Sequence, residues 1–249
     1  MTKQLQGQVA LLTGAVRRNG RAMALALAND GADIVINARN SKDEAEALAK
    51  EIEATGAKAL VHLADVTDRK QVDGMVDTII KTFGRIDILI NNAADRGKTD
   101  FLKMSYEEWK HVCDIILDGA FHCSQAVIPH MLKQGGGRII NMGGMTARTS
   151  AAGRAHVVSS KAGIEGFTRA LAFEFAKDNI AVNCISPGKI GGERAATAGE
   201  VATTPDAIPP VGYMGEPKHI AVIAHALCLP DACYTTGQTI NVNGGMIMS

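Results

Sequence analysis

Apolar residues in this chain gather in short unbroken runs, and they do not alternate cleanly with polar residues. Several of the runs are rich in β-branched side chains, which favour strands. Short continuous apolar runs are typical of strands buried on both faces, as in a parallel sheet. The expected strands are Val9–Leu12, Ile34–Ile36, Ala59–Leu63, Ile86–Ile90, Arg138–Met142, Ala181–Ile185 and Thr239–Val242.

Between some of these runs, apolar positions recur with the 3.6-residue period of a helix. The expected helices are Arg21–Asn29, Ser41–Thr55, Asp68–Phe83 and Lys161–Asp178. Strand and helix alternate with short links, which predicts a doubly wound α/β fold with a parallel, Rossmann-like sheet. Right-handed crossovers would place the carboxyl ends of the strands along one edge, where ligands bind.

No linker or internal repeat divides the chain, so residues 1–249 are expected to form a single domain. The least regular stretch is 191–213, which is rich in Ala, Thr, Gly and Pro and follows an expected strand. We interpret it as a substrate lid; the alternative is a surface loop without a role.

Charge and composition exclude several functions. The 26 basic and 26 acidic residues cancel, which argues against general nucleic-acid binding. No apolar run approaches the roughly 18 residues of a membrane span, and the first residues lack the apolar segment of a signal peptide. The five cysteines and seven histidines form no pattern with metal-ligand spacing. We therefore expect a cytoplasmic protein with reduced thiols, no metal, and no nucleic-acid or membrane partner.

A glycine-containing turn follows the first expected strand. Gly14 allows a tight turn off the strand, and Gly20 lets the next helix begin close to it. Free N–H groups at that helix start would face a pyrophosphate, with help from the helix dipole.

The end of the second expected strand indicates which dinucleotide would bind. An acidic residue here would hydrogen-bond the adenosine ribose and favour NAD, but this chain has Ala38 followed by Arg39. Arg17, Arg18 and Arg39 together would bind a 2′-phosphate, so we expect NADP(H). The alternative is that these arginines are only solvated surface residues.

Further motifs occur in a fixed order. They are the Thr13–Gly20 turn, Asp65-Val66, Asn91-Asn92-Ala93-Ala94, Lys161, Asn183 with Pro187-Gly188, and Gly237-Gln238-Thr239 with Asn243-Gly244-Gly245. On these residues the chain resembles a single-domain short-chain dehydrogenase/reductase over essentially its full length. Arg18 replaces the middle glycine of the family's turn, and the NADPH-binding pteridine reductase branch is similar in this respect.

The resemblance implies roles for individual residues. Asp65 and Val66 should border the adenine, Asn91 should steady the central strands, and Ala93 should line the cofactor. Pro187, Gly188 and Ile190 should pass the nicotinamide, and Lys161 should hydrogen-bond its ribose. Family members of this type form homotetramers and act on small molecules.

The catalytic end departs from the family. Its members protonate a substrate carbonyl with a tyrosine four residues before the lysine, and use a serine and an asparagine as well. Here those positions hold Val157, Gly144 and Ile116, while Lys161 is kept. Since Val157 has no proton to give, ordinary ketone reduction by the family mechanism is not expected. Gly192 also replaces a threonine that usually contacts the nicotinamide amide.

Nearby polar residues are candidates for replacing the lost groups. His156 titrates near neutral pH, but adjacent helical residues point about 100° apart, so it reaches the pocket only if the helix begins late. Otherwise it is a packed or interface histidine. Arg154 would hold an anionic substrate, and Asp95 and Arg96 lie near the expected mouth of the cleft. For the last two, a plain ion pair is the alternative.

Three functions remain open from the sequence. The first is an NADP(H)-dependent oxidoreductase acting on a carbonyl or hydroxyl group, with His156, a water or the substrate as proton source. The second is an NADPH-binding regulatory or scaffold protein without turnover, which the apolar replacements favour. The third is a lyase or isomerase on the same fold, with Arg154 and Asp95 as its actors.

Overall fold

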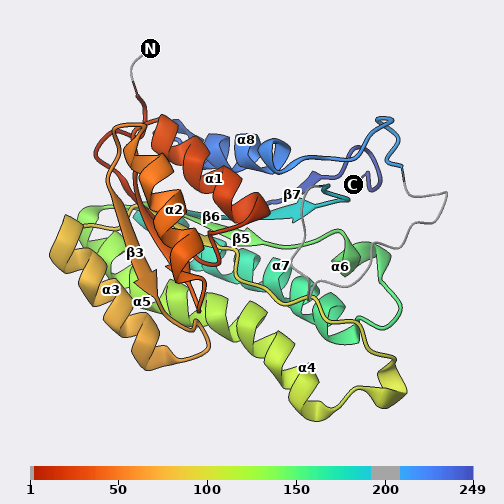
Figure 1. Cartoon of the computed structure of the whole chain (residues 1–249). Coiled ribbons are helices and arrows are strands. Elements are labelled where there is room, and N and C mark those ends of the chain that lie inside the picture. The colour runs from red at the N-terminus through yellow and green to blue at the C-terminus, as the bar shows by residue number, and fades with distance from the viewer. Residues whose placement is uncertain (1–2, 192–207, 249) are drawn as a thin grey trace.

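One sheet of seven parallel strands organises the molecule (Figure 1). The computed structural model describes residues 3–191 and 208–248. The strands are β1 (Val9–Leu12), β2 (Asp33–Ala38), β3 (Ala59–Leu63), β4 (Ile88–Asn91), β5 (Gly137–Met142), β6 (Ile180–Pro187) and β7 (Thr239–Val242). Their order across the sheet is β3-β2-β1-β4-β5-β6-β7. The predicted doubly wound α/β fold is therefore confirmed.

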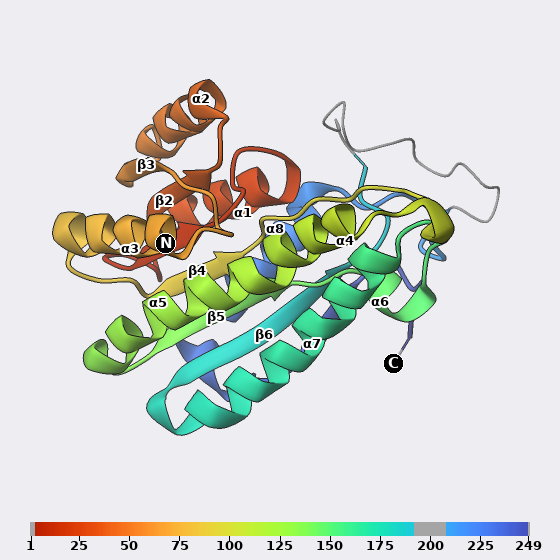
Figure 2. The ribbon, with the colours of Figure 1, turned by 90° about the horizontal axis from the view of Figure 1, so that it is seen from below.

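The helices lie in two layers on the faces of the sheet. They are α1 (Arg18–Asn29), α2 (Lys42–Glu53), α3 (Arg69–Phe83), α4 (Tyr106–Cys113), α5 (Gly119–Gln134), α6 (Thr146–Thr149), α7 (Ala155–Phe175) and α8 (Pro217–Cys228). Figures 1 and 2 show α1 and α8 on one face, and α3, α5 and α7 on the other.

Alternation along each strand divides the core between these layers. In β1, Ala10 and Leu12 belong to the core cluster under α1, α2 and α8, whereas Val9 and Leu11 pack toward α3 and α5. Both faces of the strand are buried, so its sequence is apolar throughout rather than alternating.

The order of the strands creates a crevice. The chain runs from β1 outward to β2 and β3, then returns to place β4 on the other side of β1. The loops that follow β1 and β4 therefore diverge at the carboxyl edge of the sheet, which is where open α/β sheets bind ligands.

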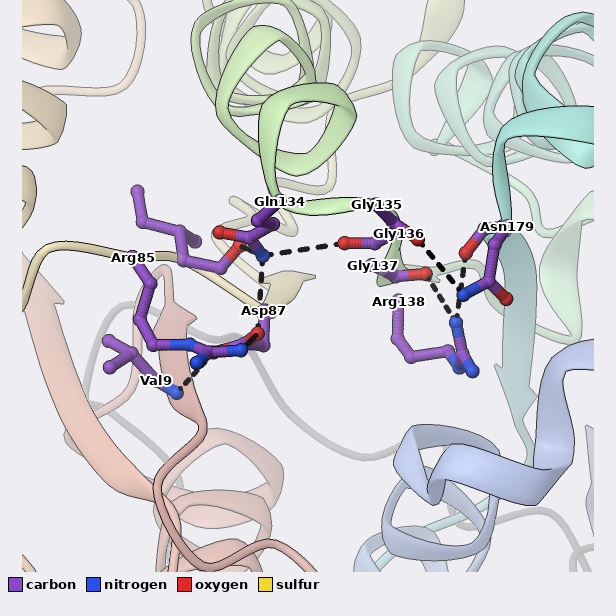
Figure 3. Close-up of polar contacts among 10 residues, drawn as sticks. Val9, Arg85, Asp87, Gln134, Gly135, Gly136, Gly137, Arg138 and Asn179 are labelled. Carbon is purple, nitrogen blue, oxygen red and sulfur yellow. Dashed lines mark hydrogen bonds and ion pairs between the residues drawn. The ribbon is translucent and has the colours of Figure 1, made fainter.

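A polar network closes the opposite edge (Figure 3). Asp87 accepts hydrogen bonds from the backbone of Val9 at 2.8 Å and from the guanidinium of Arg85 at 2.6 and 2.8 Å. Arg138 is buried and donates to the carbonyl of Asn179 at 3.1 Å. Gln134 donates to Asp87 at 3.2 Å and to the carbonyl of Gly136 at 3.3 Å, so the network ties together the amino ends of β1, β4, β5 and β6.

Two helices begin earlier than their periodicity predicted. α1 begins at Arg18 and not at Arg21, and α7 begins at Ala155 and not at Lys161. The first residues of α7 include adjacent valines, which have only modest helix propensity, so local pattern understates the helix. As a consequence, Val157 and Lys161 lie one helical turn apart.

Candidate active site

A cavity of about 700 Å³ opens at the carboxyl edge of β1, β5 and β6. The turn after β1, the loop after β4, the segment from β5 to α7 and the segment after β6 all contribute to its wall. Its main polar and glycine lining residues are Arg18, Asn19, Arg96, Lys98, Gly143, Gly144, Thr146, Arg154, Lys161, Gly188 and Lys189. This is the crevice that the strand order predicts.

The turn after β1 packs too tightly for side chains at its two glycines. Gly14 has φ +58°, and a Cβ there would lie 3.0 Å from the Cα of Ala93. A Cβ at Gly20 would lie 2.6 Å from the carbonyl oxygen of Gly14. The amide of Asn92 donates to the carbonyls of Thr13 at 3.0 Å and Gly14 at 2.8 Å, which fixes the turn against the end of β4.

Arg18 and Asn19 project from this turn into the cavity. Arg18 has a left-handed backbone, with φ +47°, in a position where glycine is the unstrained choice. Its guanidinium donates to the carbonyls of Ile190 at 2.7 Å and Gly191 at 3.3 Å, across the crevice. The side-chain oxygen of Asn19 is buried and accepts no hydrogen bond from the described residues. A donor on a bound molecule would satisfy it.

The three arginines expected to bind a 2′-phosphate do not converge in this structure. Arg17 forms an ion pair with Glu44 at the start of α2, and this carboxylate raises the pKa of Arg17. Arg39 follows β2, is half-exposed, and has its Nη1 3.9 Å from Oδ2 of Asp65. Arg18 instead reaches the segment after β6. No motif pointed to Glu44, because α2 is far from the turn along the chain.

Asn91 lies in a buried polar chain between strands and helices. Its amide donates to the side-chain oxygen of Asn141 at 2.8 Å and to the hydroxyl of Ser124 at 3.2 Å. Asn141 in turn donates to the hydroxyl of Thr168 at 3.0 Å. The chain links β4, β5, α5 and α7, which is the position expected of a residue that steadies the central strands.

Of the remaining residues named by resemblance, Pro187, Gly188 and Ile190 lie at the cavity, whereas Val66 is not among its lining residues. Val66 is buried, and its carbonyl lies 3.1 Å from Nδ1 of His122. A Cβ at Gly188 would lie 2.6 Å from the Cα of Asn243, so this glycine is required where the segment after β6 passes the C-terminal strand.

Lys161 is a buried cation on the floor of the cavity. Its Nζ donates to the carbonyl of Met142 at 2.5 Å. Burial, together with the smaller effect of the nearby positive charge of Arg96, lowers the pKa of Lys161 to about 7. A lysine with this pKa exchanges its proton near neutral pH, which an exposed lysine does not do.

The three positions that the resemblance assigns to the catalytic tyrosine, serine and asparagine carry no hydroxyl or amide here. Val157 lines the cavity one turn before Lys161. A Cβ on Gly144 would lie 3.7 Å from the Lys161 Cγ. Ile116 is 3% exposed and packs in an apolar cluster with Val157. Each of the three therefore contributes only hydrocarbon or backbone.

His156 and Arg154 are separated by the way α7 begins. His156 is fully buried, its Nδ1 accepts from the backbone of Val157 at 3.0 Å, and its Nε2 lies 3.5 Å from Glu108. It points toward α4 and is not among the residues that line the cavity. Arg154 precedes the helix and does line it. The geometry therefore agrees with the packed alternative for His156.

The loop after β4 contributes two cations, of which the sequence singled out one. Arg96 and Lys98 both line the cavity. Asp95 is not among the lining residues, and its Oδ2 lies 3.4 Å from Nε2 of His111. No motif marks Lys98, because its neighbourhood depends on how two distant loops pack.

Ser160 has a structural role within α7. Its hydroxyl donates to the carbonyl of His156 at 2.7 Å.

The expected lid lies mostly outside the described residues, since 192–207, including Gly192, are not among them. In residues 3–191 and 208–248, no group of three or more His, Cys, Asp or Glu side chains is placed to hold a metal ion. No helix in that part of the chain has the length and apolar character needed to cross a bilayer.

Comparison with known proteins identifies the family. The protein-family model described as Enoyl-(Acyl carrier protein) reductase matches residues 14–247. A 3-oxoacyl-(acyl-carrier-protein) reductase of Synechocystis sp. is 40% identical over 250 residues, covering 98% of both chains. The enzymes of the same name from Staphylococcus aureus and Thermotoga maritima are 38% and 35% identical, covering 96% and 98% of this chain and 98% and 100% of their own. The parallel sheet, the glycine turn after β1 and these relatives agree, and the chain belongs to the short-chain dehydrogenase/reductase family of oxidoreductases.

Proposed function

We propose that the protein is an NADP(H)-dependent oxidoreductase that acts on a carbonyl or hydroxyl group of a small molecule. The observation that carries this proposal is the tight turn at Gly14 and Gly20 beside a cavity lined by Arg18 and Lys161. A Cβ at Gly20 would clash with the turn at Gly14, so only glycine lets α1 begin beside that turn with its first N–H groups available to a pyrophosphate. The names of the relatives, which are reductases, support the reaction class.

The residues of the crevice fit such a cofactor. Arg18 has the charge for a pyrophosphate, and Asn19 has a buried oxygen that lacks a donor among the described residues. In this proposal the cofactor site is formed by Gly14, Arg18, Gly20, Arg39, Asp65, Val66, Ala93, Lys161, Pro187, Gly188 and Ile190. Arg17 would join it only by leaving Glu44, and Asn91 supports it by steadying β4 and β5. When bound, NADP(H) supplies or accepts a hydride.

The proton comes from a different group than in the family pattern. Val157 offers no hydroxyl, and His156 faces Glu108 rather than the cavity. Lys161 has its pKa lowered to about 7, so its ammonium gives up a proton readily at neutral pH. We assign the proton to the Lys161 Nζ, with transfer to the substrate oxygen directly or through a water in the cavity. Arg154 and Arg96 would orient the substrate.

Cofactor choice tests the role of Arg39. Arg39→Asp is expected to weaken NADPH binding about 10- to 100-fold, since a charge-assisted pair is lost and a second carboxylate joins Asp65. The same change should improve NADH binding, because an acidic side chain accepts from the ribose hydroxyls. Calorimetric titration of both cofactors measures this.

The matched control is Arg39→Gln, which removes the charge without adding an acid. It should lose affinity for NADPH and gain none for NADH. If Arg39→Asp leaves the ratio of the two affinities unchanged, Arg39 has no part in selecting the cofactor.

Restoring the missing hydroxyls tests the catalytic end. A serine fits at Gly144, since its Cβ would make only ordinary contacts, 3.7 Å from Lys161 Cγ and from Thr146 Oγ1. Val157 borders the cavity, so a tyrosine ring there has space to extend. Val157→Tyr with Gly144→Ser is expected to raise NADPH-dependent reduction of a neutral ketone by about 10²-fold or more. Absorbance at the reduced-nicotinamide band follows the reaction.

Val157→Phe with Gly144→Ser is the control, because it supplies the ring without its hydroxyl. Equal rates in the two double variants would mean that the cavity has changed beyond these positions, and would contradict the assignment of Val157 to the tyrosine position.

A second function is favoured by one observation. The cluster of Val112, Ile116, Ala120, Val157, Ile164 and Cys184 fills the region beside Lys161 with apolar side chains. This is the arrangement expected of an NADPH-binding regulatory or scaffold protein without turnover. Substrate-dependent oxidation of NADPH that is lost in Lys161→Met would exclude it.

A homotetramer is also part of the proposal. Phe121 on α5 and Phe173 on α7 are 45% and 92% exposed, and large exposed aromatic side chains mark surfaces that bind other chains. The mass of the protein in solution, measured by light scattering, tests this assembly.

A further inference from the structure

The charges in the cavity are all of one sign. Six of the described residues that line it have a basic side chain. The described lining residues include no Asp and no Glu. Arg18 belongs to the turn after β1 and Lys189 to the segment after β6. The other four come from the loop after β4 and from the start of α7, on the wall that holds Val157. They are Arg96, Lys98, Arg154 and Lys161.

Packing between two loops brings this second group together. The backbone N–H of Thr99 donates to the carbonyl of Gly153 at 2.9 Å. Gly153 has φ +70°, and a Cβ there would lie 3.2 Å from Cγ of Lys98. The loop after β4 therefore lies directly against the loop before α7, so Lys98 is held beside Arg154.

Placing these cations together has an energetic cost. Like charges within several ångströms repel each other, and water screens the repulsion less where the site is partly enclosed. The positive charge of Arg96 disfavours protonation of Lys161 and so contributes to lowering its pKa. A bound anion would relieve the repulsion among these lining cations. The N-terminal end of α7 adds positive potential at the same place.

We infer that the substrate carries a carboxylate or phosphate group that binds between Arg96, Lys98 and Arg154, next to Lys161. This inference rests on the proposed function, because it names the substrate class of the same site. Since the cavity of about 700 Å³ must hold the nicotinamide end of the cofactor as well, the substrate is a small acid. A bound anion would also favour the protonated form of Lys161, with Arg96, Arg154, Lys98 and the Cys184 thiol as the other titratable groups nearby.

Three probes of similar size separate charge from shape. Acetoacetate carries a carboxylate, dihydroxyacetone phosphate carries a phosphate, and acetylacetone is a neutral diketone. Each is titrated by ligand-observed NMR at pH 6.5 into the full-length protein, with and without saturating NADP⁺. At least one anionic probe is expected to bind ten or more times more tightly than acetylacetone. Which of the two binds identifies the headgroup, and equal affinity for all three probes would overturn the inference.

Variants assign the binding to the cluster. Lys98→Met and Arg154→Met are each expected to weaken binding of the anionic probe about 10- to 100-fold, as for loss of a charge-assisted hydrogen bond. Lys218→Met removes the same charge from an exposed site on α8 and should leave the affinity unchanged. Unfolding temperatures check that each variant is folded.

The possible failures are distinguishable. Anion binding that survives in both Lys98→Met and Arg154→Met would overturn this inference while leaving cofactor binding in place. A protein that ignores NADP⁺ yet binds the anion through these residues would refute the proposed function and retain the anion site.

Discussion

Gly20→Ala is expected to reduce NADPH affinity by more than about 100-fold. The added methyl would lie 2.6 Å from the carbonyl oxygen of Gly14 and 2.9 Å from both the Cα of Ala15 and the amide nitrogen of Asn92. Two of these three atoms belong to backbone, so the turn after β1 must open or α1 must move away from it. Either movement displaces the N–H groups that would bind the pyrophosphate. Overpacking of this kind also costs about 1–3 kcal/mol of stability.

Gly74→Ala is the matched control for this experiment. Gly74 lies within α3, and a Cβ there would meet nothing within 4 Å. The alanine should leave NADPH affinity unchanged and raise the free energy of unfolding by about 0.5–1 kcal/mol, because glycine is the poorer helix former. If Gly20→Ala binds NADPH as well as Gly74→Ala does, the turn after β1 is not the cofactor cradle.

Lys161→Met is expected to change how stability depends on pH. The pKa of Lys161 is about 7 in the folded protein and returns toward its ordinary value of 10.5 on unfolding. Below pH 7 the lysine is protonated in both states, and the folded protein bears the full cost of a buried charge. Between these two pKa values the unfolded chain binds a proton that the folded protein does not. The free energy of unfolding should therefore gain about 1.4 kcal/mol per pH unit from this residue as the pH rises.

Urea unfolding at pH 7 and pH 9 measures the effect as a difference between the two proteins. Contributions from other groups cancel in that difference, so wild type should gain roughly 2–3 kcal/mol relative to Lys161→Met over this interval. Lys218→Met, at an exposed site, should follow wild type. Parallel pH dependences for wild type and Lys161→Met would show that Lys161 keeps an ordinary pKa and cannot serve as the proposed proton source.

Hydrophobic pattern predicted the sheet well because its strands are buried on both faces. Every residue of β1 and of β6 is buried. Because neither strand has a solvent-facing position, apolar residues run along it with few interruptions and identify it as a strand. The sequence predicted the first residues of the helices less accurately. α7 begins at Ala155, and Val157 in its first turn packs with Val112 of α4. The residues near Ala155 in the sequence contain no information on that contact between helices.

The candidate site likewise contains residues that the sequence predicted and residues that only the structure revealed. Gly14, Gly20 and Lys161 lie in motifs that the sequence predicted, and the structure places the turn of the two glycines beside the cavity that Lys161 lines. Lys98 and Glu44 carry no motif. Lys98 is placed by the contact between Thr99 and Gly153, and Glu44 by packing of α2 near the turn. Contacts between segments this far apart depend on tertiary structure, so the sequence alone did not reveal them.

The segment between α4 and α5 has an unusual backbone. Asp114–Asp118 forms a single π-helical turn between α4 and α5, and Ile116 lies in it with its side chain buried. Such turns are uncommon and occur most often at functional sites. The side chain of Ile116, at the position that the resemblance assigns to the catalytic asparagine, belongs to the apolar cluster that includes Val157.

We propose that the dinucleotide crevice is functional although Val157, Gly144 and Ile116 occupy the positions that the resemblance assigns to the catalytic tyrosine, serine and asparagine. Calorimetric titration of the wild-type protein with NADPH, and separately with NADH, at pH 7 tests it most directly. We predict a dissociation constant in about the micromolar range for NADPH, and binding of NADH that is at least about tenfold weaker. No heat of binding with either cofactor at millimolar concentration would contradict the claim.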